Sequence, residues 1–217
     1  MSIDAVDMMV VHRVFRREFQ DMPGLIAAVA AGDTARAKVV GDHVKFMVDA
    51  LHHHHAAEDE LVWPKLQSRA PSRQADLQRM VDEHGEIAAA VDRVEFMLPT
   101  WAKSADSKLT EQLSAAASEL SARVGQHLED EERNAVPIIE EHLTQQEWAA
   151  AVKQAASFIS PRNLRLGIVL GGLVLDGASE EERRIILSGA PLPQRLVVQL
   201  FSARTTAAYR RRLHGSP

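Results

Sequence analysis

The chain has 217 residues, of which 46% are apolar, and it carries a formal net charge of −5 with no cysteine. This length suffices for one helical core with an appendage, or for two small domains. Without cysteine there are no disulfides and no thiolate ligands, so any bound metal must be held by nitrogen and oxygen donors.

The amino terminus, which begins Met1-Ser2-Ile3-Asp4, has no basic region followed by a long apolar run, so we expect no secretory signal. The longest apolar stretch, 166–175, is interrupted by glycines and is too short to span a bilayer. We therefore expect a soluble, cytoplasmic protein with no membrane partner. The lack of cysteine agrees with a reducing compartment.

Four amphipathic segments follow one another from the amino terminus, and each repeats its inward residues at alternating steps of three and four. The four inward stripes are Met8, His12, Phe15, Phe19, Met22 and Ile26; Val40, Val44, Met47, Leu51, His54, Glu58 and Leu61; Leu77, Met80, His84, Ile87, Val91, Val94 and Leu98; and Leu113, Ala117, Leu120, Val124, His127, Glu131 and Ile138. Their lengths predict an all-α fold with an up-down-up-down four-helix bundle.

The breaks between these segments carry turn and capping residues. Connections are expected at Gly32–Asp33, at Ala70–Ser72 and from Pro99 to Asp106. Ser72 is expected to cap the third helix, and Pro23 to kink or interrupt the first. Short links of this kind join antiparallel neighbours.

A helical extension is expected after the fourth segment. Thr144 and Glu147 form a capping-box pattern that begins a fifth helix reaching about Phe158. Shorter or amphipathic helices without a metal motif are expected at 163–175, 179–187 and 193–213. We therefore divide the chain into 1–158, a metal-binding bundle plus a fifth helix, and 159–217, a basic extension of unknown role.

Charge divides the chain near Pro161. Residues 161–217 hold nine Arg against four acidic residues, a net charge of +5, so residues 1–160 carry −10. The cluster Arg210-Arg211-Arg212 could contact nucleic acid, but no aromatic-rich or helix-turn-helix pattern accompanies it. We therefore expect a solvated tail, or one docked on the acidic part or on a protein partner, rather than nucleic-acid binding.

The most specific pattern in the chain is a duplicated hairpin, in which a lone His is followed 42 or 43 residues later by a His-x-x-x-Glu step. The six residues are His12, His54 and Glu58 in the first copy and His84, His127 and Glu131 in the second. Pro64 and Pro137 each follow the Glu of their copy by six residues, so one helical hairpin is written twice.

All six residues fall on the inward stripes, where a buried carboxylate is costly unless it is paired or coordinated. No Lys or Arg occupies the same stripes at that level. A His and a Glu four residues apart lie on one face, about 6 Å apart along the axis, and so can address adjacent metals. The pattern predicts a metal site of four His and two Glu. Two metals are favoured over one because the hairpin is duplicated.

Three other histidines flank the stripe beside the first His-x-x-x-Glu step, namely His52, His53 and His55. Because they are out of phase with the inward positions, we expect them to be solvated or to support the ligands from outside. The acidic residues next to Glu58 and Glu131 are read as solvated faces.

This order and spacing, with the local sequences His55-Ala-Ala-Glu-Asp-Glu-Leu-Val-Trp-Pro and His127-Leu-Glu-Asp-Glu-Glu, resembles the hemerythrin-like (HHE cation-binding) domain of bacterial type over roughly residues 4–145. The resemblance implies a bundle around a non-haem di-iron centre whose two iron ions share an oxo or hydroxo bridge. It also implies that the four His are terminal ligands and the two Glu are bridging carboxylates: His12, His54, His84, His127, Glu58 and Glu131.

The chain departs from the oxygen-carrying members of that family, which have a second His one turn after the third-helix His. Here that position is Ala88, and Met80, one turn before, cannot replace an imidazole. The open positions would be filled by water, by an external ligand or by a residue from elsewhere, such as Tyr209. A more open site favours reaction with O2, H2O2 or NO over reversible oxygen storage.

Two functions remain in competition, and the sequence does not decide whether the chain is an enzyme. One is reaction of the di-iron site with O2 or H2O2, with catalase-like peroxide decomposition favoured and His53 or His55 as proton relays. The other is a sensor or carrier that binds O2 or NO, or senses iron, and reports through 159–217. Ferritin-type storage is disfavoured because Glu-x-x-His pairs are absent. Zinc hydrolysis is disfavoured because six nitrogen and oxygen ligands suit an octahedral redox pair better.

Overall fold

The computed structural model describes residues 3–159, 164–188 and 192–215 and is all-helical over these ranges, as predicted. The helices are α1 (Val6–Ala27), α2 (Thr34–Leu61), α3 (Trp63–Arg69), α4 (Gln74–Ser104), α5 (Ser107–Asn134), α6 (Val136–His142), α7 (Gln145–Ala155), α8 (Leu164–Leu175), α9 (Glu180–Ser188) and α10 (Leu192–His214), with 3₁₀ turns at Pro71–Arg73 and Ala156–Phe158. None of the described helices combines the length and the apolar character needed to cross a membrane. The expected boundary at Pro161 lies outside the described residues.

Side chains that accept hydrogen bonds from free backbone N–H groups begin several helices. Asp33 caps α2 and Asp106 caps α5, each accepting from the backbone N–H three residues further on at 2.9 Å. The capping box predicted at the start of α7 is confirmed, because the side chains of Thr144 and Glu147 each bond to the other residue's backbone. These caps fix where the chain turns.

The cap expected at Ser72 is wrong, and of the kink or interruption expected at Pro23 the interruption does not occur. Ser72 does not cap a helix, because it lies inside the 3₁₀ turn, and α4 begins at Gln74 with no side-chain cap. Pro23 lies inside α1, which continues to Ala27 without interruption. A proline costs the helix one backbone hydrogen bond, and the buried residues on either side of Pro23 outweigh that loss.

The connection expected from Pro99 begins instead after Ser104. Pro99 lies inside α4, and the helix ends only where Ala105 takes the left-handed conformation, with φ 46°. Trp101, in the turn after the proline, is fully buried and donates its indole N–H to the Thr110 hydroxyl at 2.8 Å. That burial and hydrogen bond hold the last turn in place.

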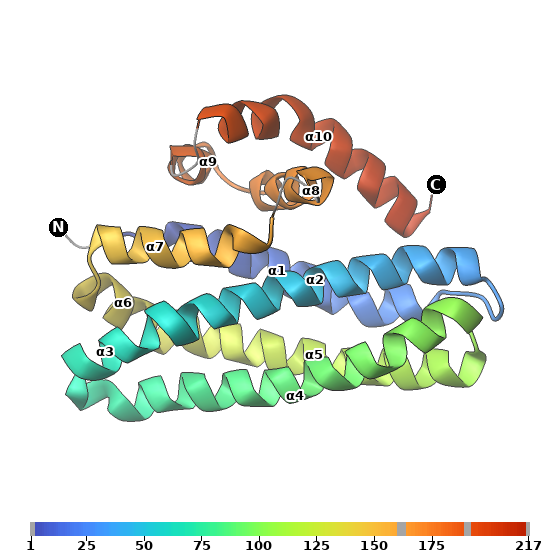
Figure 1. Ribbon diagram of the computed structural model, residues 1–217, viewed down its shortest axis with the longest axis horizontal. Coiled ribbons are helices and arrows are strands. Elements are labelled where there is room, and N and C mark those ends of the chain that lie inside the picture. The colour runs from blue at the N-terminus through green and yellow to red at the C-terminus, as the bar shows by residue number, and fades with distance from the viewer. Residues whose placement is uncertain (1–2, 160–163, 189–191, 216–217) are drawn as a thin grey trace.

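The four long helices α1, α2, α4 and α5 lie side by side (Figure 1). α1 packs against α2 and α5, and α4 packs against the same two helices. The short helices α3 and α6 follow breaks at Val62 and Ala135, at equivalent positions in the two copies of the hairpin. The duplication in the sequence therefore extends to the positions at which the helices end.

The apolar core consists of two clusters with a polar layer between them. One cluster includes Phe15, Leu51, Ile87 and Val124, and the other includes Met8, Val62, Met80 and Ala135. Along each long helix, the residues between these two sets are the predicted His and Glu positions. The inward stripes are thus core positions, and the polar residues interrupt the core at one level.

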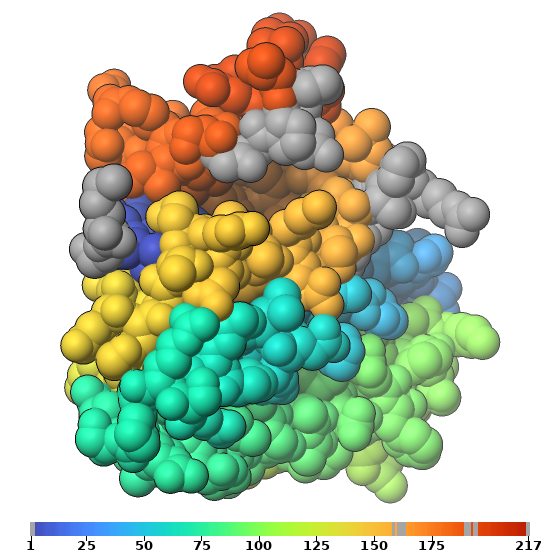
Figure 2. Space-filling view, turned by 60° about the vertical axis from the view of Figure 1, so that its left-hand side comes forward, coloured from blue at the N-terminus to red at the C-terminus, as the bar shows by residue number. Residues whose placement is uncertain are grey.

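The helices from α7 onward form a further layer on one side of the four long helices (Figures 1 and 2). α7 lies along α2, α8 packs against α10 and touches α1, and α10 also reaches α2. Two ion pairs join α1 to this layer: Arg13 with Glu182 at 2.9 Å and Arg17 with Asp176 at 3.6 Å. The described part of the basic extension is therefore docked rather than solvated, and in these two pairs it supplies the anions.

α8 and α10 approach each other closely at Gly172. A Cβ atom at this position would lie 2.0 Å from the hydroxyl oxygen of Thr206. That hydroxyl donates to the backbone carbonyl of Val169 at 3.3 Å. Any side chain at Gly172 would therefore push α10 away from α8.

We expect Gly172→Val to lower the free energy of unfolding by about 1–3 kcal/mol through overpacking, measured by urea denaturation followed by circular dichroism. Gly125→Ala is the matched control, because a Cβ there meets nothing within 4 Å. Replacing a helical glycine in open space should stabilise the protein by up to about 1 kcal/mol. Equal stability of Gly172→Val and the wild type would contradict the close approach.

Candidate metal centre

All six residues predicted as ligands lie together in the polar layer, and all six side chains are buried. α1 carries His12, α2 carries His54 and Glu58, α4 carries His84, and α5 carries His127 and Glu131. Two groups have ligand atoms within 4.8 Å of one another and could each hold a metal ion: His12, His54, Glu58 and Glu131 in the first, and His55, His84 and His127 in the second. We call them the first and the second donor group.

The two glutamates connect the donor groups. One oxygen of Glu58 lies 3.2 Å from Nε2 of His54, and its other oxygen lies 3.6 Å from Nε2 of His84. The corresponding distances for Oε2 of Glu131 are 3.4 Å to Nε2 of His12 and 3.6 Å to Nε2 of His127. Each carboxylate therefore contacts one imidazole from each group.

The carboxylate oxygens of Glu58 and Glu131 are buried, and all four lack a hydrogen-bond donor. Burial, and next the negative charge of Glu131, raises the pKa of Glu58 well above its ordinary value. Two facing carboxylates in an apolar core are costly unless a cation lies close to both. The site therefore has the electrostatics of a cation site.

Carboxylates around the polar layer orient three imidazoles through their Nδ1 atoms. The Nδ1 atoms of His84, His127 and His12 lie 2.8, 2.8 and 3.0 Å from carboxylate oxygens of Asp59, Glu83 and Glu132, respectively. Assigning the proton to Nδ1, which then donates to the carboxylate, leaves each Nε2 with a free lone pair directed into the layer.

These Nε2 atoms are closely paired. The Nε2 atoms of His84 and His127 are 3.2 Å apart, and the same distance separates those of His12 and His54. With Nδ1 protonated on both His84 and His127, their Nε2 lone pairs repel each other, and a cation bound to both nitrogens removes that repulsion. Burial, and next the neighbouring imidazoles, lowers the pKa of His54 well below its ordinary value, so this ring is also neutral and able to bind metal.

Two of the outer carboxylates were not identified as functional by their sequence pattern. Asp59 and Glu132 belong to the acidic runs read as solvated faces, yet each accepts a hydrogen bond from an imidazole. Partial burial opposes ionisation of Glu132, but hydrogen bonds from His12 and from both terminal nitrogens of Arg16 lower its pKa to about 2. The signal available in the sequence is positional, because each of the two follows the inward Glu of its copy.

His55 is a further candidate donor that the helical stripe did not indicate, and of its two expected roles, solvated or supporting the ligands from outside, the solvated one is wrong. The side chain is buried, its ring stacks on that of His84 with centroids 4.0 Å apart, and its Nε2 has no partner. Residues 54 and 55 are about 100° apart around α2. Because α2 packs against both α1 and α4, His54 faces His12 while His55 faces His84.

At two positions in the site, a polar or ionisable residue in one copy of the hairpin corresponds to an apolar residue in the other. His55 corresponds to Leu128 in the second copy, and Glu83, which accepts from His127, corresponds to Val11 in the first. The second donor group therefore has three imidazoles, whereas the first has two and an apolar neighbour. The helices around the site are arranged in two equivalent hairpins, but the two donor groups differ in their number of imidazoles.

The donor set fits divalent cations that accept both nitrogen and oxygen. Five imidazoles and two carboxylates converge, and the chain offers no sulfur from cysteine. Such a set suits iron and similar first-row ions better than calcium or magnesium, which prefer oxygen alone.

Comparison with known proteins gave one finding. The family model described as Hemerythrin HHE cation binding domain matches residues 5–139, more than half of the chain. This range contains both donor groups and ends within α6. Searches of curated proteins and of solved structures found no match.

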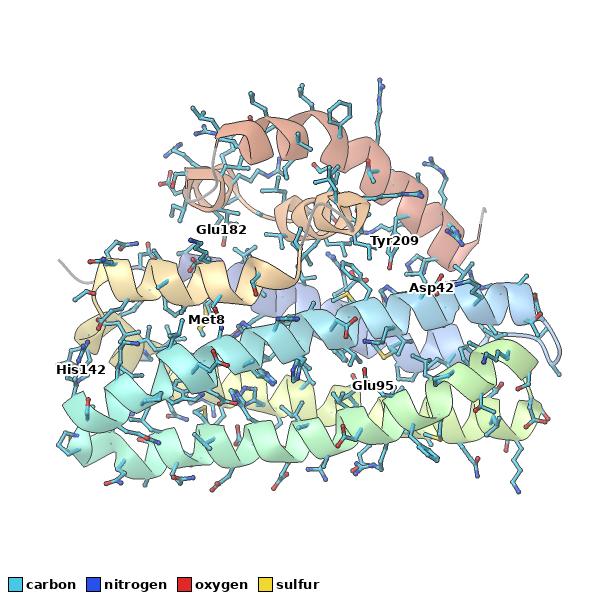
Figure 3. The ribbon with its side chains drawn as sticks, viewed as in Figure 1. Met8, Asp42, Glu95, His142, Glu182 and Tyr209 are labelled. Atoms are coloured by element: carbon cyan, nitrogen blue, oxygen red, sulfur yellow. The ribbon has the colours of Figure 1, made fainter. Side chains whose placement is uncertain are left out.

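Tyr209, a candidate for completing the site, lies elsewhere. On α10 it points toward α2 (Figure 3), and its hydroxyl is 2.8 Å from Nδ1 of His43. His43 precedes His54 by eleven residues, or roughly 16 Å along the helix axis. The expectation that Tyr209 fills an iron position is therefore wrong. Its contact with His43 instead attaches α10 to α2.

His43 should make stability depend on pH. The groups facing it are Glu18 of α1, at 3.8 Å, and Tyr209 and His214 of α10. Burial, and next the charge of His214, lowers the pKa of His43 from 6.5 to about 4. Between these two values the unfolded chain binds a proton that the folded protein does not, so stability is lost as the pH falls from about 6.5 to about 4.

Between pH 7 and pH 4, the wild type should lose up to about 3 kcal/mol more of its unfolding free energy than His43→Gln. Glutamine keeps a partner for Tyr209 but does not titrate, and the remaining ionisable groups are common to both proteins. Urea denaturation at a series of pH values measures the difference. Parallel stability curves for the two proteins would refute a neutral buried His43.

Proposed function

Because the chain belongs to the family of the hemerythrin HHE cation-binding domain, we propose that it is a non-haem iron protein that holds two iron ions per chain. Metal binding follows from the family and from the two donor groups, and the identity and number of the ions are the proposal. The observation that carries it is the set of four buried oxygens of Glu58 and Glu131 without hydrogen-bond donors between paired imidazoles.

The proposed ligands follow the two donor groups. His12 and His54 bind the first ion, His55, His84 and His127 bind the second, and Glu58 and Glu131 bridge the two. In this proposal, the four long helices around the ligands form the up-down-up-down bundle of this family. Residues 1–158 then form the metal-binding unit, and residues 159–217 form an extension.

The two donor groups leave different room for an external ligand. With both glutamates counted, the first group offers two imidazoles and two carboxylates, and the second offers three imidazoles and the same carboxylates. For ions that prefer six ligands, more positions remain open beside His12 and His54. An external ligand is therefore expected on this side of the site.

Two irons side by side would supply a two-electron redox partner, which suits O2 or H2O2. The residues of the chain contribute orientation and exclusion of water. Asp59, Glu83 and Glu132 hold three imidazoles in one tautomer, and the apolar clusters on either side of the layer keep bulk water out. We propose that the protein binds and reacts with O2 or H2O2, with peroxide decomposition as the enzymatic form.

A second candidate is reversible binding of O2 or NO by a carrier or sensor. Ala88 leaves the third long helix without the second His of oxygen-carrying relatives, but His55 offers a fifth imidazole from α2. The number of nitrogen donors therefore no longer favours reaction with O2 or H2O2 over reversible binding of O2. The location of His55 among the donors is the observation that favours this second candidate, and it removes His55 as a proton relay.

Removal of His55 should cost iron, whereas removal of its neighbour should not. Apoprotein loaded anaerobically with Fe(II) is expected to retain two irons per chain in the wild type. His55→Ala should bind iron at least about tenfold more weakly, measured by iron content after desalting. His52→Ala is the matched control, since His52 is exposed on the same turn of α2. Fewer than two irons in the wild type, or equal loss in both variants, would refute the ligand assignment.

The response to oxidants separates the two candidate functions. After anaerobic loading, H2O2 is added while absorbance and dissolved oxygen are recorded, and O2 is added and removed in a parallel sample. Repeated release of O2 from H2O2 would establish peroxide decomposition. A spectrum that forms with O2 and reverses when O2 is removed would establish a carrier or sensor. Iron that gives neither response would exclude both.

A further inference from the structure

The last described helix, α10, lies at the outer edge of the molecule, beyond α8 (Figures 1 and 2). Its inner side packs on the glycines of α8: Val198 lies next to Gly171, and Ser202 and Thr206 lie next to Gly172. Ser202 and Thr206 are both buried in this contact. Two polar residues thus take inward positions near the middle of the helix.

Leucines take the outward positions instead. Leu192, Leu196 and Leu200 follow one another at steps of four, so they lie along one face of α10. Their exposed fractions are 70%, 55% and 69%, and the adjacent Phe201 is 53% exposed. More than half of the large apolar residues that are exposed in the described part of the chain lie on this one helix. The exposure is therefore concentrated rather than scattered.

This distribution is the reverse of the one that water favours. A helix docked on a protein in water normally directs its apolar side chains inward and its polar side chains outward. Single exposed apolar residues are ordinary on a protein surface, whereas a group of them marks a contact with something else. The inner contacts of α10 are already made by α8 and α2. The outward leucines therefore fit an apolar environment outside this chain.

Positive charge accompanies the exposed leucines. Arg204 and Arg211 follow Leu200 by four and eleven residues and so share its side of the helix. Both are exposed, and neither has an ion-pair partner among the described residues, whereas Arg210 pairs with Asp176 at 2.6 Å. The sequence of α10 contains no Asp or Glu, against five arginines: Arg195, Arg204, Arg210, Arg211 and Arg212.

We call this the outer surface of α10 and define it by six residues: Leu192, Leu196, Leu200, Phe201, Arg204 and Arg211. A membrane with anionic lipids matches both of its features, because leucine and phenylalanine enter the boundary of the lipid chains while arginines bind the headgroups. A second copy meeting the same surface about a two-fold axis would bring arginines toward arginines. Nucleic acid would match the arginines but would leave the leucines in water.

We propose that the outer surface of α10 docks on an anionic lipid membrane, with the helix lying in the plane of the membrane surface. A helix that lies on a membrane does not need to cross it, and none of the described helices is long and apolar enough to do so. The remainder of the chain up to residue 160 carries −10, so an anionic surface repels it and the metal-binding bundle faces away. Such contact differs from the sequence-based expectation of no membrane partner.

Vesicle sedimentation with the full-length chain tests this contact. The wild type should bind vesicles of phosphatidylcholine mixed equally with phosphatidylglycerol, and should bind several-fold less at high salt or to phosphatidylcholine alone. Leu196→Gln combined with Leu200→Gln should abolish binding. Phe96→Gln is the matched control, because Phe96 is 86% exposed but lies on α4. Circular dichroism checks that each variant keeps the helical content of the wild type.

The charge on α10 is tested separately. Arg204→Gln should bind the mixed vesicles about fivefold more weakly, which is the effect of one arginine at an anionic surface. Lys108→Gln removes one positive charge from an exposed position on α5 and should bind as the wild type does. Equal weakening in both variants would show a response to net charge alone and would overturn the proposal.

The other partners give distinct results, each of which overturns the proposal. A wild type that ignores vesicles and is a dimer in gel filtration, with a monomeric leucine double variant, would assign the surface to a second copy. A wild type that binds duplex DNA but not vesicles would assign it to nucleic acid. Vesicle binding that the leucine double variant retains would mean that only charge is recognised. None of these measurements depends on iron, so they stand or fall apart from the proposed function.

Discussion

Two glutamates, Glu58 and Glu131, lie buried between two apolar clusters, and their oxygens have no hydrogen-bond donor among the described residues. The arrangement of the surrounding polar side chains depends on these two carboxylates. An ionised carboxylate buried without a partner costs several kcal/mol. A bound cation removes that cost, and a cation bound here would take its other ligands from imidazole nitrogens that point inward. The outer carboxylates favour this orientation by accepting hydrogen bonds from the opposite nitrogens, Nδ1. Imidazoles and then further carboxylates therefore surround the two glutamates in successive layers.

Because the hairpin is duplicated, one short sequence pattern specifies both halves of this arrangement. Each copy contributes a lone His, a His-x-x-x-Glu step, an acidic residue after the Glu and a break before a proline. Each Glu contacts one imidazole of its own copy and one of the other, so neither copy forms the site alone. The departures from symmetry, His55 and Val11, are what make the two sides of the site chemically different.

The helical periodicity predicted all-helical structure, the inward stripes and the location of six donors in one layer, because buried positions on a long helix recur with a fixed period. It could not predict His55, because a stripe describes one buried face and α2 is buried against helices on two sides. It missed the helix continuing through Pro99, where burial of Trp101 overrides a local preference. Tyr209 was misplaced because its position depends on how the extension docks, which leaves no periodic signal.

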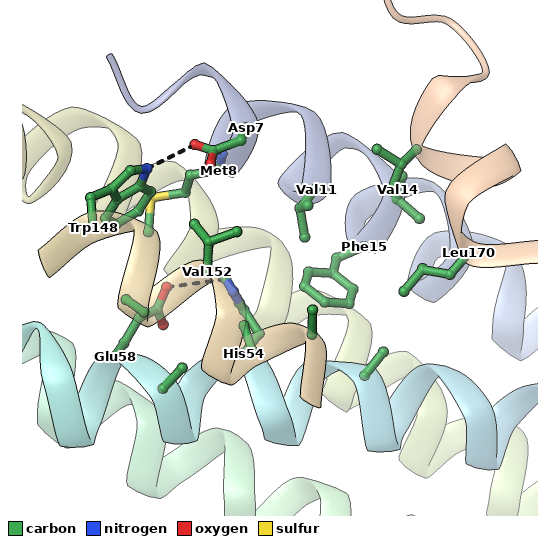
Figure 4. Close-up of a pocket in the computed structure, with 16 residues that line it drawn as sticks. Asp7, Met8, Val11, Val14, Phe15, His54, Glu58, Trp148, Val152 and Leu170 are labelled. Carbon is green, nitrogen blue, oxygen red and sulfur yellow. Dashed lines mark hydrogen bonds and ion pairs between the residues drawn. The ribbon is translucent and has the colours of Figure 1, made fainter. Parts of the chain in front are cut away.

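A pocket of about 160 Å³ beside His54 (Figure 4) takes much of its outer wall from α7 and α8, whereas every proposed ligand lies between residues 12 and 131. The residues proposed to hold metal and many of the residues that shape this pocket therefore come from different parts of the chain. Substitutions in residues 145–175 can reshape the pocket without altering a single donor atom. Replacing this carboxy-terminal segment would change the wall of the pocket. The two buried carboxylates, Glu58 and Glu131, and the imidazoles around them would stay in place.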